Sequence, residues 1–162
     1  TINTQAAFNI SANISWGFGA VASGSTFAVL DTEGPSATNG NWSTTGIDGF
    51  VLENTGNVDL NITLISNGTN FTAVTFIGGT TPLYKYSVLE VQGDACHSTG
   101  GTLANDIGIH FQGTGNATMI CGNFSWLDTQ DQISIEVNMT IPYDSFIGYR
   151  QDTWIITGVQ KT

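Results

Sequence analysis

The stretch FNISANISWGFGA, residues 8–20, alternates apolar residues with polar or small residues over thirteen positions. Strict alternation places every second side chain on the same face of a β-strand, so this pattern predicts one long strand with a single apolar face. Such a strand would extend about 43 Å at about 3.3 Å per residue, whereas the usual strand has about 5–6 residues. Its apolar face therefore needs an unusually long surface to pack against.

Strand patterns recur through the rest of the chain. Alternation predicts strands in VDLNITL (58–64), IGIHFQ (107–112) and ISIEVNMTI (133–141). In the last of these, every second residue from Ile133 to Ile141 should face inward, whereas Ser134, Glu136, Asn138 and Thr140 should face outward. β-branched and aromatic residues favour strands in four further runs, which are GFVLEN (49–54), FTAVTFI (71–77), YKYSVLEV (84–91) and DTWIITGV (152–159).

No segment combines a helical period with capping residues. Twenty glycines and short, regularly spaced strands instead predict an all-β fold, an immunoglobulin-like or jelly-roll-like sandwich of two sheets. A length of 162 residues suits one domain with a substantial core.

Charged residues are scarce, at 10% of the chain against about 25% in ordinary soluble domains. The net charge of −10 arises because Lys85, Arg150 and Lys161 are the only basic residues besides two histidines. This argues against nucleic-acid binding, which needs clustered Lys and Arg, and against a polybasic membrane-surface role. The sequence has no apolar run of about 18 residues and no signal peptide, and its start at Thr1 is typical of a processed or trimmed chain.

Cys96 and Cys121 are the only cysteines, and their separation of 25 positions without a CxxC pattern favours a single disulfide. Such a bond would stabilise the fold by about 3 kcal/mol through loop closure. His97 and His110 lie beside and between the cysteines, so a Cys/His metal site is the alternative.

N-glycosylation sequons are the strongest single signal in the chain. Nine of the fourteen asparagines stand in N-x-S/T, whereas the abundance of Ser and Thr predicts roughly three by chance. Attached glycans would explain how so weakly charged a surface stays soluble, and they imply export, in agreement with a disulfide. Accidental sequons in an Asn- and Thr-rich chain are the alternative. The predicted glycosylation sites are Asn9, Asn13, Asn41, Asn61, Asn67, Asn70, Asn116, Asn123 and Asn138.

The sequons agree with the strand pattern, because each falls on the polar face of a predicted strand or beside a Gly/Thr-rich turn, and none is forced into the core.

Sequence signals for catalysis are weak by comparison. No GxSxG motif frames a serine, and both histidines are expected at the surface. The acid pairs Asp128/Asp131 and Asp31/Glu33 could contribute to a calcium site, but each pair is more typical of a solvated turn.

The opening strand has three possible destinations. It can pair within its own chain, donate itself to the sheet of a neighbouring subunit, or lie on a membrane as an amphipathic strand, although lipid leaves backbone groups unsatisfied. The small-residue stretch ASGST (22–26) that follows it could act as a hinge. A sandwich that lacks one strand exposes an apolar groove, and a head-to-tail donor fills this groove in an open filament. The expected donor-strand knobs, which fill pockets in the acceptor, are Phe8, Ile10, Ile14, Trp16 and Phe18.

Two further stretches, VLENTGNVDLNITLISN (51–67) and NMTIPYDSFIGYRQDTWIITGV (138–159), resemble secreted β-sandwich proteins of archaeal cell surfaces. In that group an N-x-G-N turn precedes an alternating strand, and P-Y-D with D-T-x-I-I-T-G forms the last hairpin. With its alternating arm and dense sequons, the chain is similar to archaeal thread-type pilus subunits, and biofilm-fibre subunits are the neighbouring family. The resemblance implies a non-enzymatic filament linked by donor strands. Some related fibres also contain Lys–Asn isopeptide links, for which Lys85 and Lys161 are available.

These observations together predict a secreted, heavily N-glycosylated filament subunit that serves adhesion or biofilm formation at the cell surface. Residues 1–22 would form the donor-strand arm and residues 26–162 the pilin-like domain. Identical subunits are the expected partners, and no cofactor is expected beyond covalent glycans. A non-filamentous cell-surface, surface-layer or adhesin domain is the main alternative. A secreted carbohydrate-active enzyme, whose two carboxylates could be Asp128 and Asp131, is a third possibility.

Overall fold

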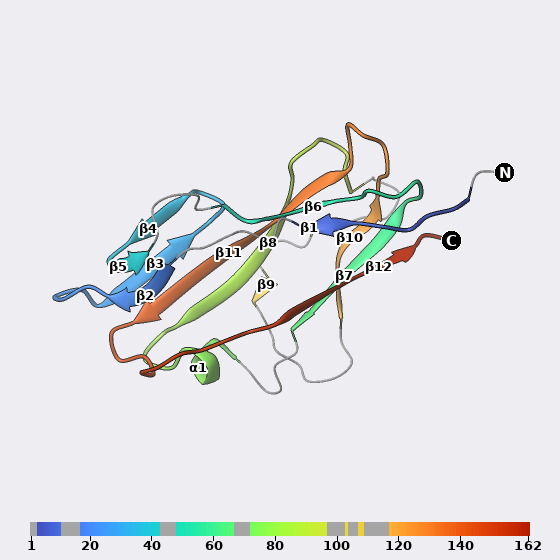
Figure 1. The fold of residues 1–162 in the computed structure, drawn as a ribbon. Coiled ribbons are helices and arrows are strands. Elements are labelled where there is room, and N and C mark those ends of the chain that lie inside the picture. The colour runs from blue at the N-terminus through green and yellow to red at the C-terminus, as the bar shows by residue number, and fades with distance from the viewer. Residues whose placement is uncertain are drawn as a thin grey trace.

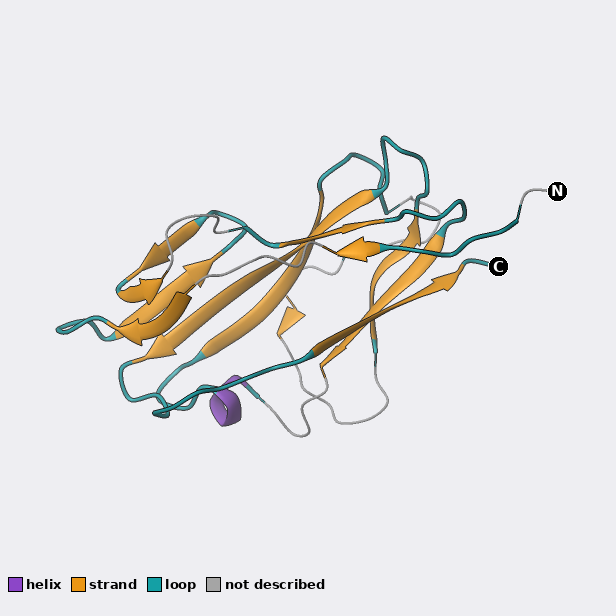
Figure 2. Ribbon diagram, in the orientation of Figure 1, coloured by secondary structure: helices purple, strands orange, loops and turns teal. Residues whose placement is uncertain are grey.

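The structure, a computed structural model, describes residues 3–10, 17–42, 48–66, 72–96, 103, 107–108 and 117–162, with only the backbone described at 17–20 and 107–108. Antiparallel strands dominate this part of the chain (Figure 1, Figure 2). In chain order they are β1 (Asn9–Ile10), β2 (Gly17–Val21), β3 (Phe27–Asp31), β4 (Ser36–Thr38), β5 (Gly40–Trp42), β6 (Phe50–Glu53), β7 (Leu60–Ser66), β8 (Leu83–Glu90), β9 (Ile107–Gly108), β10 (Thr118–Phe124), β11 (Gln132–Pro142) and β12 (Trp154–Gln160). The helix α1 (Ala73–Phe76) lies between β7 and β8 in sequence.

The larger sheet is organised around β11, its longest strand (Figure 1). One edge of β11 pairs first with β6 and then, farther along, with β3, while β8 follows the other edge from Ile133 to Thr140. The shorter strands β1, β4 and β9 extend the sheet next to β6, β3 and β8 respectively. A second sheet has the order β10-β7-β12, and β2 pairs with β5 as a separate two-stranded ribbon.

One hydrophobic core joins the two principal sheets. Leu52, Ile133 and Ile135 of the larger sheet are fully buried, and so are Ile62 and Phe124 of the smaller sheet. Buried and half-buried residues alternate along the whole of β7, as its sequence predicts for a strand with one face in the core. The predicted all-β sandwich is therefore confirmed.

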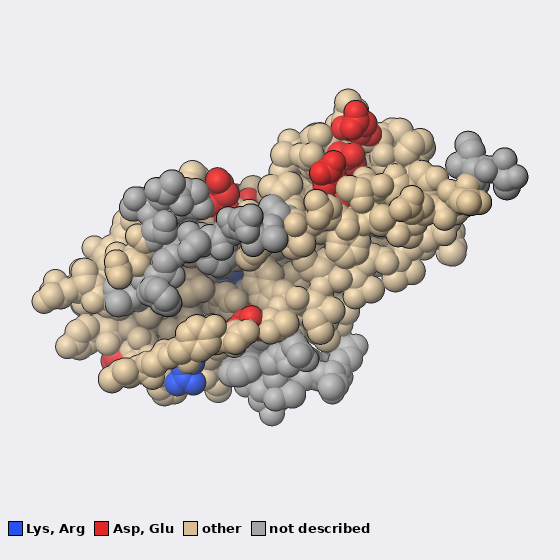
Figure 3. Space-filling view, in the orientation of Figure 1, with Lys and Arg blue, Asp and Glu red and all other residues tan. Residues whose placement is uncertain are grey.

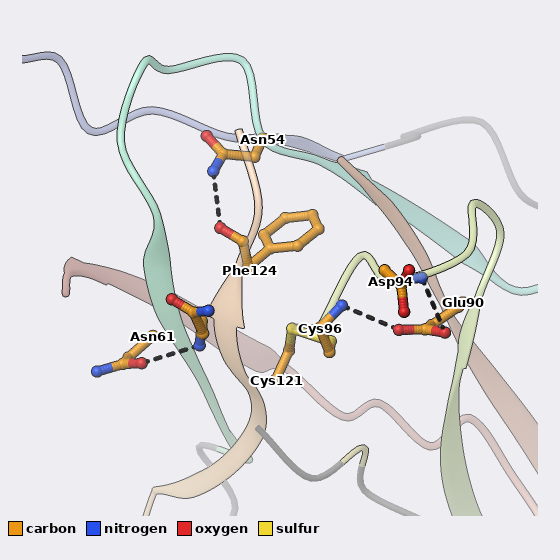
Figure 4. Close-up of a disulfide and its surroundings, with 8 residues drawn as sticks. Asn54, Asn61, Glu90, Asp94, Cys96, Cys121 and Phe124 are labelled. Atoms are coloured by element: carbon orange, nitrogen blue, oxygen red, sulfur yellow. Dashed lines mark hydrogen bonds between the residues drawn. A yellow bond between two sulfur atoms is a disulfide. The ribbon is translucent and has the colours of Figure 1, made fainter. Parts of the chain in front are cut away.

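The predicted disulfide is also confirmed. Cys96 and Cys121 are bonded, with Cα atoms 5.5 Å apart, so their sulfur atoms serve a cross-link rather than a metal site (Figure 4). Cys121 lies in β10, and Cys96 lies in the loop after β8, where its N–H donates to Glu90 Oε1 at 3.0 Å. The bond therefore ties a loop of the larger sheet to an edge strand of the smaller one.

The opening stretch is divided between two sheets, so the prediction of one long strand in residues 8–20 is wrong for its described ends. β1 pairs with β6, whereas β2 pairs with β5, with a register irregularity between Gly17 and Val21. Gly17 and Gly19 present no side chain for packing, and glycine in a strand commonly marks a bulge or a bend. Alternation alone therefore overestimated the length over which this segment pairs with a single neighbouring strand.

The strand predicted for residues 71–77 is replaced, over its middle, by helix α1. Thr72 and Thr75 form a capping box, in which Thr72 Oγ1 accepts from the Thr75 N–H at 3.2 Å and Thr75 Oγ1 accepts from the Thr72 N–H at 2.6 Å. The turn buries Phe76, whose ring stacks on Tyr84 with the centroids 5.4 Å apart. Local hydrogen bonds to the backbone therefore outweigh the β-propensity of these residues.

The face of β11 predicted to be exposed is covered along the first half of the strand. Ser134 and Glu136 are buried, although the alternation assigned them to solvent. The Thr32 hydroxyl donates to Glu136 Oε2 at 2.5 Å and accepts from the Val137 N–H at 2.8 Å. A side chain on Gly49 would also collide with the Glu136 carboxylate. Chain segments around residues 32 and 49 thus cover the Glu136 side chain.

Candidate assembly surface

Residues 3–10 lie along β6 and the turn that joins β6 to β7. Asn9 is paired with Glu53 and Ile10 with Leu52 in the β1–β6 ladder. Ahead of the ladder, Asn57 Oδ1 accepts from the Gln5 N–H at 2.7 Å, and the Asn57 N–H donates to the Gln5 carbonyl at 3.0 Å. Figure 1 shows this segment leading away from the larger sheet at the end of the molecule where the carboxyl terminus also lies. We call residues 3–10 the amino-terminal segment.

The turn that receives this segment is built around a buried asparagine. Asn54 Nδ2 donates to the Val58 carbonyl at 3.0 Å. It also donates to the Phe124 carbonyl at 3.1 Å (Figure 4). Its Oδ1 accepts from the Gly56 N–H at 3.0 Å. A Cβ atom at Gly56 would lie 2.3 Å from the Gln5 carbonyl oxygen, so only glycine permits this close approach. The N-x-G-N motif of residues 54–57 thus forms the docking turn of the amino-terminal segment.

The Phe8 ring lies against Gly158 of β12. A Cβ atom added there would lie 3.0 Å from Phe8 Cδ1 and Cε1 and 3.2 Å from Ile62 Cδ1. Phe8 and Ile10 are half-buried, and both pack against the hydrophobic core. Sequence reasoning missed Gly158, although a glycine inside the apolar run IITGV could have indicated a close approach of this kind.

The other three expected knobs lie between Ile10 and Val21 in the sequence. Phe18 lies in β2, where only the backbone is described, and Ile14 and Trp16 lie outside the described residues. The structure therefore places two of the five predicted knobs, and both of them, Phe8 and Ile10, contact the core.

Five of the nine predicted glycosylation sites are described. Asn9 and Asn41 are exposed, and Asn61 and Asn138 are half-buried in β7 and β11. Asn138 Nδ2, the atom to which a glycan would be attached, donates to Asp31 Oδ2 at 3.3 Å. The remaining sites, Asn13, Asn67, Asn70 and Asn116, lie outside the described residues.

Asn123 corrects the expectation that no sequon enters the core. It lies within β10 rather than in a turn, and only 7% of its surface is exposed. Its backbone is left-handed, with φ at 60°, next to register irregularities in the β10–β7 pairing, and its N–H donates to Asn61 Oδ1 at 3.1 Å. Its own Oδ1 accepts from Lys161 Nζ at 2.7 Å. An irregular strand thus redirects this side chain toward the end of β12.

We expect glycosylated protein to bear glycans at Asn9 and Asn41 but none at Asn123. A glycan on the buried amide would have to displace the packed chain around it, so the folded protein excludes it. Glycopeptide mapping by mass spectrometry checks this, with unfolded chain offered to the same glycosylation system as the control. An occupied Asn123 in protein that keeps its disulfide would contradict the prediction.

The same mass-spectrometric map would reveal an isopeptide link between Lys161 and Asn123. The two peptides would then be joined, with a mass lower than their sum by one ammonia.

The candidate acidic residues are engaged in local structure. Asp31 Oδ1 accepts from the Glu33 N–H at 3.1 Å, and Glu33 Oε2 accepts from the Ser87 hydroxyl at 3.0 Å. Asp131 is buried, and burial, followed by repulsion from Asp128, raises the pKa of its carboxyl above the usual range. Across the described ranges, no three His, Cys, Asp or Glu side chains are grouped so as to hold a metal ion. His97 and His110 lie outside these ranges.

The chain matches no protein-family model, no curated protein and no solved structure. In the portion that the structure describes, no helix has the length and apolar character needed to cross a membrane. Function must therefore be inferred from the residues of the chain itself.

Proposed function

We propose that the chain is a non-catalytic structural subunit of an extracellular filament that serves adhesion or biofilm formation. Subunits would join head to tail, with residues 1–22 of one subunit completing the sheet of the next. Residues 26–162 would form the acceptor domain, and identical chains would be the partners. N-glycans would be the only added groups.

The packing of Phe8 on Gly158 is the observation on which this proposal depends. The Phe8 ring fills the space that the missing side chain of Gly158 leaves on β12. The neighbouring ladder between β1 and β6 pairs only two residues of each strand. Backbone pairing combined with side chains seated in pockets is the mode of recognition used in strand addition. The same contacts can form within a chain or between two identical chains, so exchange requires no new surface.

The composition of the surface supports an extracellular position. Charged side chains are few and scattered on the face drawn in Figure 3, where neutral residues prevail. Glycans on exposed sites such as Asn9 and Asn41 would supply the solubility that charge does not. The disulfide is in keeping with an oxidising environment.

The second candidate is a glycosylated surface-layer or adhesin domain that does not polymerise. The pairing of β1 with β6 of its own chain favours it, because an internal first strand leaves no acceptor groove to fill.

Negative-stain imaging of the full chain, before and after boiling in detergent, separates the two candidates. We expect thin filaments one domain wide that resist this treatment, because each joint buries several large side chains. A chain without residues 1–22 should remain folded, should form no filaments and should bind a synthetic peptide of residues 1–22. Discrete particles of the full chain, or a truncated chain that is unfolded, would instead favour the surface domain.

A further inference from the structure

A cavity of about 310 Å³ lies at the end of the larger sheet, where β3 begins and β11 ends. Pro142 of β11 is paired with Phe27 of β3, so the two strand ends that border the cavity are held side by side. The volume is near the lower limit of about 300–1,000 Å³ for small-molecule sites, which suits a ligand of one ring. Four threonines line it, which are Thr26, Thr80, Thr81 and Thr140.

Two aromatic residues, Phe27 and Tyr143, also line the cavity. Their side chains are unusually accessible for aromatic residues, with 45% of Phe27 and 75% of Tyr143 exposed. The Tyr143 N–H donates to the Thr26 carbonyl at 2.9 Å, which holds the backbone of Tyr143 beside the cavity. The two residues therefore offer apolar ring surface to a bound molecule.

One carboxylate, that of Asp144, is fixed at the cavity by hydrogen bonds. Asp144 Oδ1 accepts from the Thr80 N–H at 2.9 Å, and Oδ2 accepts from the Thr80 hydroxyl at 2.7 Å. These bonds lower the pKa of the Asp144 carboxyl, so it is ionised over a wide pH range. A side chain at Gly79 would overlap Asp144 Oδ1, so this glycine permits the arrangement. A carboxylate has about four accepting positions, and Thr80 occupies two of them.

Thr81 has a backbone conformation that β-branched residues rarely adopt, with φ at 58°. Its hydroxyl donates to the Thr80 carbonyl at 2.7 Å. Strained residues of this kind are costly to hold in place and concentrate at binding sites. The strain thus occurs at a residue that lines the cavity.

We propose that this cavity binds one neutral sugar ring, with Tyr143 and Phe27 against its C–H face and with Asp144 and the threonines bonded to its hydroxyl groups. The described residues that line the cavity include a carboxylate and no basic side chain, which disfavours an anionic ligand. A wholly apolar ligand would leave the polar groups unpaired. The site does not depend on polymerisation, and it would give the surface a specific glycan target.

Ligand-observed saturation-transfer NMR tests the site on the full chain, in filaments or as single subunits. The probes are the methyl pyranosides of glucose, galactose and mannose, together with N-acetylglucosamine. We expect saturable transfer to at least one sugar, with a Kd on the order of 1–10 mM. Tyr143→Ala and Asp144→Asn should each weaken binding about tenfold or more. The matched control Tyr149→Ala removes another exposed tyrosine, one that does not line the cavity, and should leave the Kd unchanged.

Three outcomes would overturn the proposal. These are the absence of saturable transfer to all four sugars, binding that neither cavity variant changes, and equal transfer to cyclohexanol, which lacks the additional hydroxyl groups. Because Tyr143 is largely exposed, Tyr143→Ala should fold normally, and circular dichroism checks this. The test therefore remains decisive even if Asp144→Asn disturbs its loop.

Discussion

Replacing Gly158 with valine is expected to weaken every joint of the filament. The new side chain would occupy the space of the Phe8 ring, since even a Cβ atom would come within 3.0 Å of it. Gly158 lies in a strand and has no left-handed backbone, so valine adds no conformational strain of its own. Full burial of a phenylalanine contributes about 1.5–3 kcal/mol, so displacing the half-buried Phe8 ring should weaken each joint by up to roughly 150-fold. Imaging and analytical centrifugation measure the loss.

A size exchange provides the sharpest control for this prediction. Phe8→Ala alone should also weaken assembly, whereas the double variant Phe8→Ala/Gly158→Val should recover part of the loss because the smaller knob leaves room for valine. Thr157→Val places a similar side chain at an exposed position of the same strand and should have no effect. If Gly158→Val instead lowers the stability of single subunits at every concentration and filaments persist, the segment pairs within its own chain.

Replacing Asp152 with alanine is expected to lower the free energy of unfolding by about 3–5 kcal/mol, a large part of the about 5–15 kcal/mol typical of a domain. Its Oδ1 accepts from the Ser66 hydroxyl at 2.6 Å and from the Thr153 N–H at 2.7 Å. Its Oδ2 accepts from Tyr84 Oη at 3.1 Å and from Trp154 Nε1. One carboxylate therefore connects β7 and β12 of the smaller sheet with β8 of the larger one.

The size of this effect follows from the burial of the donors. Ser66 and Tyr84 are buried and Trp154 is half-buried, so each donor that loses its acceptor costs about 1–3 kcal/mol. Burial, and then the Asp152 carboxylate, raise the pKa of Tyr84 far above its ordinary value, which keeps the phenol protonated as a donor.

Urea unfolding of single subunits measures the change, with Asp128→Ala as the control, because Asp128 is exposed in a turn and should shift stability by no more than about 0.5 kcal/mol. The loss of unfolding free energy for Asp152→Asn should lie between the losses for Asp152→Ala and Asp128→Ala, because asparagine keeps one accepting oxygen. An Asp152→Ala variant as stable as the control would show that water replaces the lost acceptor.

The sequence predicted the strands well where one face lies in the core and the other is partly open to solvent. It predicted them poorly where contacts with distant segments determine which side chains are buried. Alternation identified the core face of β7, because the period of a strand is a property of its own backbone. Along β11 the same pattern missed the burial of Glu136, because the hydroxyl that covers it comes from Thr32, 104 positions away. The strand predicted at α1 failed because side chain–backbone hydrogen bonds between Thr72 and Thr75 are not visible in a hydrophobic pattern.

The features of the candidate assembly surface also differ in whether the sequence alone could predict them. The sequence by itself determined the all-β class, the pairing of its two cysteines and the choice of Phe8 and Ile10 as inward side chains, since these depend on composition and local period. Only the tertiary structure decided that Phe8 meets Gly158, that Asn123 is buried against Lys161 and that Asp152 links the two sheets. Each of these contacts joins residues at least 38 positions apart, and which strands become neighbours depends on how the whole chain packs.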